Sequence, residues 1–385
     1  MHRQSWDVVI VGAGPAGATL GYELARRGLA VLILEKHALP RYKPCGGGIT
    51  LRTARALGLD LTPVLEDTVS DLTVTHARAR GFHRRTPRPF LHTVMRDRFD
   101  YLLVERAQRA GAVIWDRCTV QRVATDAGQA RVVTTRGEVV GQVLAGADGA
   151  TGLVARSVGL LRDVPYCVAL EAEVAVSPSE IDHWRGTIAI DFGYTPWGYG
   201  WVFPKAAGLS VGGGVAPTQG REVRRLLDAY LATLKLKGAR VTRVVGHPIR
   251  FRSVGEPIQT GHTLLLGDAA GLADNLTAEG IYYAIRSAQI AAPHVVAFLQ
   301  SEVPDLAGYQ QEVDATLGGE LQLAKAITTP FYRLMQYAPW IIFQAMRHSE
   351  TLWEYFCDLQ RGEITYQELR QRLRFLVPLA RLLAR

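Results

Sequence analysis

A glycine-rich turn close to the N-terminus is the segment of this chain best suited to hold a phosphate-bearing ligand. Asp7 is followed by an apolar, β-branched run at residues 8–11, which leads directly into Gly12-Ala-Gly14-Pro-Ala16-Gly17. Gly12 permits a tight bend, Gly14 lets the backbone approach a pyrophosphate, and Gly17 lets the following helix pack on the strand. The helix N-terminus adds free N–H groups and the positive end of a helix dipole.

A carboxylate follows this turn at the spacing that a dinucleotide site requires. Glu35 comes directly after a second apolar run, residues 30–34, and can accept hydrogen bonds from ribose hydroxyls. The order strand, glycine turn, helix, strand and acid is complete, which favours a dinucleotide-binding unit over a βα turn without a ligand. The motif alone does not distinguish NAD from FAD.

Two later strand ends carry an aspartate beside a glycine. Gly146-Ala-Asp148-Gly149 and Gly267-Asp268 each end an apolar run, and ligands of open α/β folds bind at the carboxyl ends of strands. Asp268 can bind a sugar-alcohol chain, and a helix that begins at Gly280 can stabilise negative charge on a reduced ring. The alternative is that these aspartates only cap helices.

Three aromatic residues alternate with smaller ones in a predicted strand. Tyr199, Trp201 and Phe203 are separated by Gly200 and Val202, so the three rings share one face of the strand. Such a face suits a long apolar substrate that is flat at each double bond. It is equally typical of an ordinary sheet core.

Composition indicates a soluble globular protein of two domains, or of one domain with a large insertion. The chain has 385 residues, of which 48% are apolar and 21% charged; a single core seldom grows that large. No apolar run approaches the ~20 residues of a membrane span, and the N-terminus has no usable signal peptide. We therefore expect a cytoplasmic protein with reduced thiols. The four cysteines are far apart and show no metal-ligand spacing, so no metal is expected.

The net charge of +8 is compatible with an anionic substrate, an anionic membrane surface or nucleic acid. The densest basic patch is residues 78–88. No nucleic-acid-reading motif accompanies the charge, so a nucleic-acid partner is not expected. A peripheral contact with a membrane surface, or a phosphorylated lipid, remains open.

The pattern of apolar residues predicts where the elements lie. We expect short strands over 70–95, a helix from Arg96 to Ala110, and strands near 112–125 and 130–145, with a hairpin turn at 135–138. Thr50 is expected to cap a helix that extends to Ala56. Antiparallel strands and one helix (Arg221 to Leu236) follow, and helices dominate after a strand at Thr263. The aromatic-rich tail from Phe331 to Arg385, with Arg370, Arg372 and Arg374 near its end, is either packed helices or an interfacial segment.

Taken together, these segments resemble the aromatic-hydroxylase type of flavoprotein and, more narrowly, the geranylgeranyl reductase family. The narrower similarity rests on Lys43-Pro-Cys-Gly-Gly-Gly48, on Tyr199-Gly-Trp-Val-Phe-Pro-Lys205, and on Gly267-Asp-Ala-Ala-Gly271 continued by Leu276-Thr-Ala-Glu-Gly-Ile-Tyr-Tyr283. It covers the chain to about Ala291.

This resemblance implies FAD as the cofactor and assigns a role to each matching residue. Gly12, Gly14, Ala16 and Gly17 would hold the pyrophosphate, and Glu35 the adenosine ribose. Arg98 would touch the ribityl or phosphate region, and Val123 would pass near the adenine. Asp268 would bind the ribityl chain, and Gly280 and Ile281 would meet the isoalloxazine. Cys45 and Gly46 would line the reactive face of the flavin, and Tyr199, Trp201 and Phe203 would form a substrate wall.

The reaction implied is reduction of carbon–carbon double bonds in a polyprenyl chain by a hydride from flavin N5 plus a proton. An alkene has no carbonyl to polarise, so a nearby proton donor is needed. Cys45 is the candidate donor, although Arg41 and Lys43 would favour a thiolate, which cannot donate. The alternative for Cys45 is a small residue in a glycine-rich loop. NADPH and ferredoxin remain open as electron donors, as do the polyprenyl lipid or diphosphate that is reduced and the oligomeric state.

The resemblance also implies the fold: an α/β protein with a FAD-binding Rossmann-like domain, an inserted, mainly antiparallel β-sheet substrate domain, and a helical C-terminal tail. We expect the FAD-binding domain at 1–70, 96–164 and 261–315, the substrate domain at 71–95 and 165–260, and the helical region at 316–385.

Three other functions share parts of this pattern. A flavin monooxygenase of a small aromatic substrate fits the flavin motifs equally well, but the thiol- and glycine-containing loop argues against it. A halogenase is disfavoured because Trp197 and Trp201 are not at the Trp-x-Trp spacing of that group. A non-catalytic flavin- or lipid-binding protein would have no need of every flavin motif.

Overall fold

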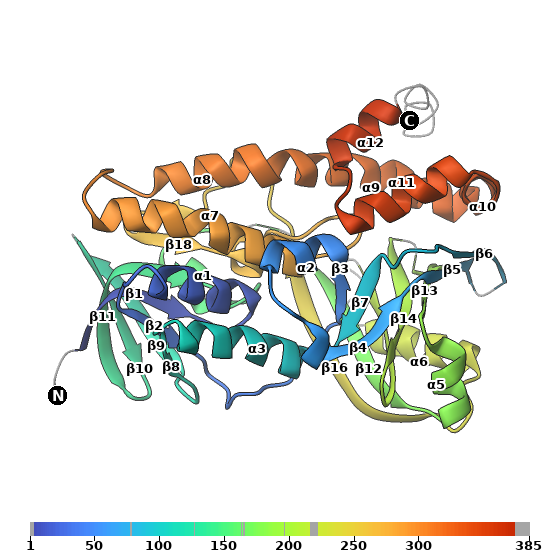
Figure 1. The fold of residues 1–385 in the computed structure, drawn as a ribbon, viewed down its shortest axis with the longest axis horizontal. Helices are drawn as coiled ribbons and strands as arrows, with labels where there is room; N and C mark the ends of the chain where they lie inside the picture. Colours follow the sequence, from blue (N-terminus) through green and yellow to red (C-terminus); the bar gives the residue numbers. More distant parts are fainter. Residues whose placement is uncertain are drawn as a thin grey trace. The chain divides into compact units, whose positions relative to one another are not determined.

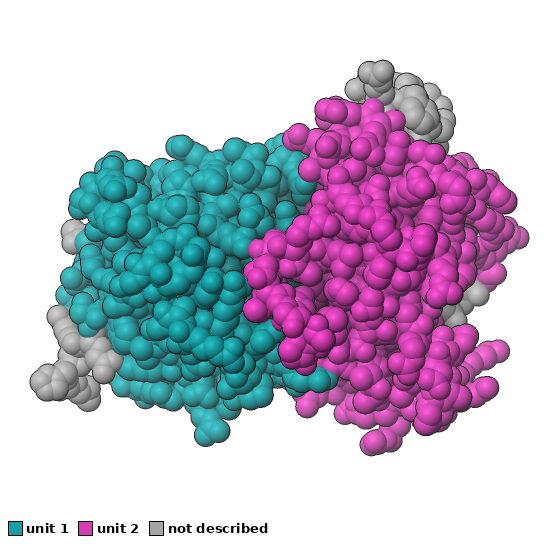
Figure 2. All heavy atoms as spheres, in the orientation of Figure 1, with its two compact units in different colours: residues 1–42, 97–165, 249–322 teal, residues 43–96, 166–248, 323–385 magenta. Residues whose placement is uncertain are grey.

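The chain passes three times through each of two compact units (Figure 2). The computed structural model describes residues 4–77, 79–126, 128–162, 164, 166–195, 197–215 and 222–373. Unit 1 contains residues 1–42, 97–165 and 249–322, and unit 2 contains residues 43–96, 166–248 and 323–385.

A parallel row of strands forms the centre of unit 1 (Figure 1). The row is β8 (Val113–Trp115), β2 (Val31–Leu34), β1 (Gln4–Val11), β11 (Gly137–Gly146) and β18 (Thr263–Leu265). Val8, Val9 and Ile10 are completely buried, as expected for strands that are covered on both faces. Val11 pairs with Gly146 and Gly146 with Leu265. The carboxyl ends of β1, β11 and β18 therefore meet at one edge of the sheet.

The remaining strands of unit 1 are antiparallel additions to this row. β17 (Gln259–Thr260) pairs with β18, and β9 (Val120–Asp126) and β10 (Gln129–Thr134) form a meander with β11. The predicted turn at 135–138 is confirmed, because Thr134 pairs with Gly137. The stretch predicted as strand near 112–125 forms two strands, β8 and β9. They are separated by a bend at Arg117, whose φ is 48°.

The helices of unit 1 begin with the one that the glycine turn opens. α1 packs against β2 and α7, and α3 coincides with the helix predicted from Arg96. The helical segments are α1 (Pro15–Ala25), α3 (Arg96–Arg109), α4 (Leu153–Ser157), α7 (Ile281–Leu299), α8 (Ala307–Val313), the 3₁₀ turn η3 (Gly267–Ala270) and the π turn η4 (Asp314–Gly318).

A larger sheet that is mainly antiparallel dominates unit 2. The strands neighbour one another in the order β16-β12-β15-β14-β13-β5-β6. From β12 to β6 along this order, every neighbouring pair is antiparallel except β13 with β5, which is parallel. Their bounds are β16 (Arg240–Arg250), β12 (Tyr166–Ala175), β15 (Gly208–Val215), β14 (Gly198–Lys205), β13 (Thr187–Thr195), β5 (Asp71–His76) and β6 (Arg80–Arg85).

This sheet has two different faces. Val202 and Val211 pack with Leu227 and Tyr230 of α6 (Val223–Leu234), and α5 (Pro178–Trp184) adds Trp184 to the same core. The opposite face carries the odd-numbered residues of β14, because side chains alternate along a strand. That second face contains the aromatic residues singled out in the sequence.

A small sheet in unit 2 explains where residues 43–70 belong. β7 (Leu91–Val94) pairs on one side with β3 (Gly48–Thr50) and on the other with β4 (Leu65–Val69), which follows η1 (Thr62–Val64). Thr50 then caps α2 (Leu51–Leu57) by accepting the Thr53 N–H at 3.3 Å, as predicted. The predicted domain boundaries group 43–70 with the FAD-binding residues, whereas strand pairing with β7 groups them with unit 2.

The C-terminal helices bury part of their aromatic residues in a core. They are α9 (Gly319–Tyr337), α10 (Pro339–His348), α11 (Glu350–Arg361) and α12 (Tyr366–Arg372). Phe343 and Trp353 are buried with Phe82 and Phe90 of the strands and their connection. Packing is therefore the observed role of these aromatics. Arg374 and the rest of 374–385, like Arg78 of the basic patch, lie outside the described residues.

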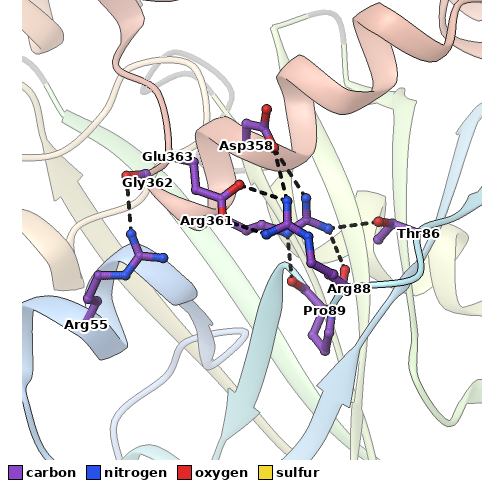
Figure 3. Close-up of polar contacts among 8 residues, drawn as sticks. All are labelled: Arg55, Thr86, Arg88, Pro89, Asp358, Arg361, Gly362 and Glu363. Atoms are coloured by element: carbon purple, nitrogen blue, oxygen red, sulfur yellow. Dashed lines mark hydrogen bonds and ion pairs between the residues drawn. The ribbon is translucent and has the colours of Figure 1, made fainter.

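A buried arginine fastens α11 to the segment between β6 and β7 (Figure 3). Arg361 is 4% exposed and donates to the Pro89 carbonyl at 3.0 Å, the Arg88 carbonyl at 2.6 Å and the Thr86 hydroxyl at 2.8 Å. Arg88 pairs in turn with Glu363 just after the helix. The end of α11 is therefore held by polar contacts as well as by its apolar face.

Candidate active site

The glycine turn of unit 1 has a geometry that excludes a side chain at two positions. Gly12 has a φ of 105°, and a Cβ there would overlap the Ala147 carbonyl oxygen. A Cβ on Gly17 would overlap the Gly12 carbonyl oxygen. At Gly14 the nearest atom to such a Cβ would be Nη2 of Arg41, 3.5 Å away. The turn is tight on its inner side and open at Gly14, as it must be where a pyrophosphate approaches the backbone.

The first turn of α1 supplies the donors for that pyrophosphate. The helix begins at Pro15, which loses no hydrogen bond at this position. The N–H groups of Ala16 and Gly17 belong to the first turn, where no intrahelical acceptor exists. They and the helix dipole favour an anion.

Glu35 ends β2 as a buried, multiply bonded carboxylate. It is 4% exposed and accepts the N–H of Ala13 at 3.1 Å and of His37 at 3.0 Å. Arg41 donates to Glu35 at 3.2 Å and to Asp100 at 3.0 Å. The carboxylate is thus fixed beside the glycine turn. Sequence reasoning missed Arg41 as a member of this site, because its partners lie on β2 and α3.

Asp268 and Gly280 lie against one another at the carboxyl end of β18. A Cβ on Gly280 would lie 2.9 Å from Oδ1 of Asp268, so glycine permits this close approach. Gly280 is the N-cap of α7, and Ile281 is its first residue. Asp274, which the sequence analysis did not single out, is completely buried and accepts the N–H of Leu276 at 2.7 Å. It shapes the loop that delivers the chain to α7.

The other predicted residues of unit 1 have simpler surroundings. Asp148 accepts the Val154 N–H at 3.0 Å, so for this aspartate the helix-capping alternative describes what it does, and burial raises its pKa. Arg98 is an exposed residue in the first turn of α3, and Val123 is buried in β9 opposite Val132. The roles of Arg98 and Val123 toward the cofactor stay predictions.

These features of unit 1 fit FAD. The open glycine position and the first-turn N–H donors of α1 suit the pyrophosphate of that cofactor, the carboxylate of Glu35 suits its adenosine ribose, and the carboxylate of Asp268 suits its sugar alcohol. The N-terminus of α7 offers a dipole for charge on a reduced ring. The assignment of each contact to a part of FAD remains a prediction.

The thiol loop, which we define as residues 43–48, belongs to unit 2 and is held by its backbone. Cys45 is partly exposed, and its N–H donates to a carboxylate oxygen of Glu171. The Gly47 N–H donates to Sγ of Cys45 at 3.3 Å. Lys205 donates to the carbonyls of Gly46 at 2.7 Å and Val94 at 2.8 Å. The position of the thiol is therefore determined by groups on β12, β14 and β7.

The two cations that precede Cys45 in the sequence have other partners. Arg41 is bound by Glu35 and Asp100, and Nζ of Lys43 lies 2.7 Å from Nε2 of His247 on β16. Because both cations are held by these partners, their closeness to Cys45 in the sequence no longer predicts a thiolate there.

The aromatic residues of β14 share one face, as predicted. The rings of Tyr199 and Trp201 are 6.3 Å apart. A Cβ on Gly46 would lie 2.9 Å from the Phe203 ring and 3.2 Å from Nε1 of Trp201. The glycines of the thiol loop therefore let it pack directly on this face. The role of the three rings as a substrate wall stays a prediction.

A cluster of three buried polar residues contacts the thiol loop. Sequence reasoning did not identify this cluster. Glu171, Lys205 and Ser210 are 2%, 4% and 0% exposed. Ser210 donates to Glu171 at 2.7 Å and accepts from Nε1 of Trp201 at 3.3 Å. Burial raises the pKa of Glu171 to about 7 and lowers that of Lys205. The available signal was a pair of glutamates, Glu171 and Glu173, inside an otherwise apolar strand.

Comparison with known proteins identifies the family. A family model described as FAD binding domain matches residues 5–315. A geranylgeranyl diphosphate reductase of Rhodobacter capsulatus is 32% identical over 327 residues, covering 80% of this chain and 80% of that protein. An uncharacterized protein of Methanosarcina barkeri is 30% identical over 333 residues, 86% of this chain and 85% of its own length.

Solved structures agree on the fold. The crystal structure of a geranylgeranyl bacteriochlorophyll reductase-like protein from Thermoplasma acidophilum matches with a TM-score of 0.81 at 22% identity, covering 97% of this chain and 100% of that one. A flavin-dependent brominase matches with a TM-score of 0.73 at 20% identity, covering 93% and 94%. The FAD-binding α/β fold with antiparallel sheets and C-terminal helices is thereby confirmed. With its flavin motifs, its thiol loop and these relatives, the chain belongs to the FAD-binding domain family as an FAD-dependent oxidoreductase of the geranylgeranyl reductase family.

Proposed function

We propose that this protein reduces carbon–carbon double bonds in a polyprenyl chain, carried by a lipid or a diphosphate. The observation that carries the proposal is the thiol loop, in which buried hydrogen-bonding groups hold a partly exposed Cys45 and the adjacent Gly46 packs on an aromatic strand face. A thiol in a loop that packs on aromatic rings suits protonation of an alkene. The name of the Rhodobacter capsulatus relative, geranylgeranyl diphosphate reductase, supports the same substrate class.

The chemistry requires a proton and a hydride to arrive at neighbouring carbons. Bound in its reduced form, FAD supplies the hydride. The S–H bond of Cys45 breaks as the alkene π electrons form a new C–H bond, which places positive charge on the more substituted carbon. That carbon would then accept the hydride, which completes the second C–H bond. Aromatic faces such as those of Trp201 and Phe203 attract a cation through their ring quadrupoles and exclude water.

Substitution of the thiol tests this function. FAD-loaded protein is reduced anaerobically with dithionite and mixed with geranylgeranyl diphosphate. The masses of the products are then measured by mass spectrometry. We expect wild type to add two hydrogens per double bond and Cys45→Ala to lose at least ~100-fold in rate, the usual scale of a lost general acid. Cys118→Ala, at a buried cysteine of unit 1, serves as the control.

Two outcomes would contradict the proposal in different ways. Undiminished turnover by Cys45→Ala would remove this residue from the mechanism. A wild-type protein that reduces no polyprenyl compound but oxygenates an aromatic in air would establish the monooxygenase alternative. Supplying NADPH or reduced ferredoxin in place of dithionite identifies which donor reduces the flavin.

We also propose a peripheral contact with an anionic lipid surface, through the corner between α9 and α10. Tyr337, Trp340 and Ile341 are 72%, 54% and 42% exposed, although the neighbouring aromatics of the same helices are core. Arg347 on α10 and Arg80 on β6 are exposed cations of the same unit, and the Arg347 guanidinium donates to the Gly81 carbonyl. Aromatic and basic residues together are typical of surfaces that lie in a membrane interface. In the described part of the chain no helix combines the length and hydropathy needed to cross a bilayer.

A further inference from the structure

The buried group behind the thiol loop forms one continuous row across three strands. Glu171 on β12 pairs with Gly212 on β15, and Gly212 pairs with Trp201 on β14. A Cβ on Gly212 would overlap the indole of Trp201, so this glycine lets the indole lie across β15. Ser210, on the same face of β15, connects the two ends of the row by hydrogen bonds to both.

From this geometry we infer that Glu171 is a positioning and proton-storing residue that acts through Cys45. One of its oxygens accepts the Cys45 N–H, and the other accepts the Ser210 hydroxyl. The inference rests on the proposed function, because it gives the proton that Cys45 donates a source inside the protein.

The Ser210 contact allows Glu171 to hold or release a proton without breaking the loop. As a carboxylate, Glu171 accepts the Ser210 proton. As a carboxylic acid, it can donate to the same hydroxyl oxygen, which has a second lone pair for the Trp201 N–H. The bond from Cys45 N–H is kept in both states. A buried carboxyl without such a reversible partner would lose a hydrogen bond on changing its protonation state.

The proton cycle balances with water as the final source. After Cys45 has given its proton to the alkene, the thiolate takes the proton of the Glu171 carboxylic acid by way of a bridging water, because the direct contact between the two residues is at the Cys45 backbone N–H. Glu171, now a carboxylate, is reprotonated by water. No further oxidant or reductant is needed beyond the hydride source already named.

The charges around Glu171 set the pH at which this cycle fails. Burial raises its pKa to about 7, and Glu173 on the same face of β12 adds to the increase; Ser210, Lys205 and the Cys45 N–H oppose it. Below this pH Glu171 is protonated and can supply the thiol. Alkene reduction by wild type should therefore fall about tenfold between pH 6 and pH 8, as expected for one group with a pKa of about 7.

Glu171→Gln tests the inference directly. We expect an FAD-loaded protein with normal flavin absorption, an alkene reduction at least ~10-fold slower at pH 6, and no inflection near pH 7. Two further variants test the same assignment by shifting the inflection in opposite directions. Glu173→Gln should move the inflection to lower pH because it removes a negative charge, and Ser210→Ala should move it to higher pH because it removes a donor to the carboxylate. These opposite shifts remain informative if Glu171→Gln folds poorly.

A second readout does not depend on turnover. The rate at which iodoacetamide alkylates Cys45, followed by peptide mass at pH 8, reports its thiolate fraction. Glu171→Gln should raise this rate, because a neighbouring carboxylate disfavours the thiolate. If wild type reduces alkenes but Glu171→Gln keeps both its pH profile and its alkylation rate, this inference is wrong and the proposed function stands. If wild type reduces no alkene at any pH, the proposed function itself has failed.

Discussion

At the scale of single residues, the glycines of the N-terminal turn serve two different purposes. One glycine is required by the fold, and another leaves room for a ligand. Gly17 is needed for the fold, because a Cβ there would overlap the Gly12 carbonyl oxygen, whereas Gly14 has room for one within unit 1. Gly14 also has a φ of −78°, which any residue can adopt. The open space at Gly14 is therefore best explained by a ligand that approaches the backbone.

Gly14→Ala should fold normally and bind FAD poorly. The added methyl group would occupy the space expected for the pyrophosphate, so we expect a dissociation constant for FAD at least ~10-fold higher, or about 1.4 kcal/mol. Flavin fluorescence titration of the apoprotein measures the affinity, and its thermal midpoint checks the fold. Gly17→Ala is the comparison: overpacking should cost the fold about 1–3 kcal/mol. Unchanged FAD affinity in Gly14→Ala would show that the pyrophosphate binds elsewhere.

What the sequence could predict at this scale depends on how far apart the partners are. Gly12, Gly17 and Glu35 belong to one local unit, so their spacing already specifies the turn that the structure shows. Glu171 meets Cys45 across 126 residues of chain, and Lys205 meets Gly46 across 159. No local spacing encodes such contacts, which arise only when β12, β14 and the thiol loop pack together.

At the scale of elements, strong periodicity was predictable and short pairing segments were not. The buried runs of β1 and β2 and the amphipathic α3 match the predictions closely. β3, by contrast, has only three residues and no alternating pattern of its own, and only pairing with β7 makes it a strand. The 112–125 stretch has one continuous pattern, but the bend at Arg117 divides it between a parallel and an antiparallel neighbour.

The packing of α11 against the segment between β6 and β7 can be tested by substitution. Arg361 is buried and satisfies the Thr86 hydroxyl and two carbonyl oxygens (Figure 3). Arg361→Met would leave those acceptors buried and unpaired, so we expect a loss of about 2–4 kcal/mol in the free energy of unfolding, measured by urea denaturation. Arg88→Gln removes only the ion pairs that this exposed side chain makes with Glu363 and Asp358, and it should leave the midpoint unchanged. Equal midpoints for both variants would mean that apolar packing alone holds α11.

At the scale of the whole molecule, charge and exposed aromatics make the case for a lipid surface. The net charge of +8 attracts the chain to anionic membranes, where each nearby basic residue contributes about 1 kcal/mol. Many of the cations are already engaged: Arg84 pairs with Glu350, Arg85 with Asp71 and Arg88 with Glu363. Charge by itself would therefore give weak and salt-sensitive adsorption, and firm binding needs apolar insertion as well.

The corner at Tyr337, Trp340 and Ile341 is where that insertion should occur, so sedimentation with vesicles is the measurement. Wild type should sediment with vesicles of phosphatidylglycerol and phosphatidylcholine at low salt. A variant carrying Trp340→Ser and Tyr337→Ser should lose at least ~10-fold in partitioning, because two interfacial aromatics are removed. Trp197→Ser is the control for general hydrophobicity, because Trp197 is an exposed tryptophan between β13 and β14, elsewhere in unit 2. Unaltered binding by the double variant, or an equal loss in the control, would place the membrane contact on another surface. If wild type fails to bind vesicles, the proposed membrane contact is wrong, and a polyprenyl substrate must reach the protein from solution.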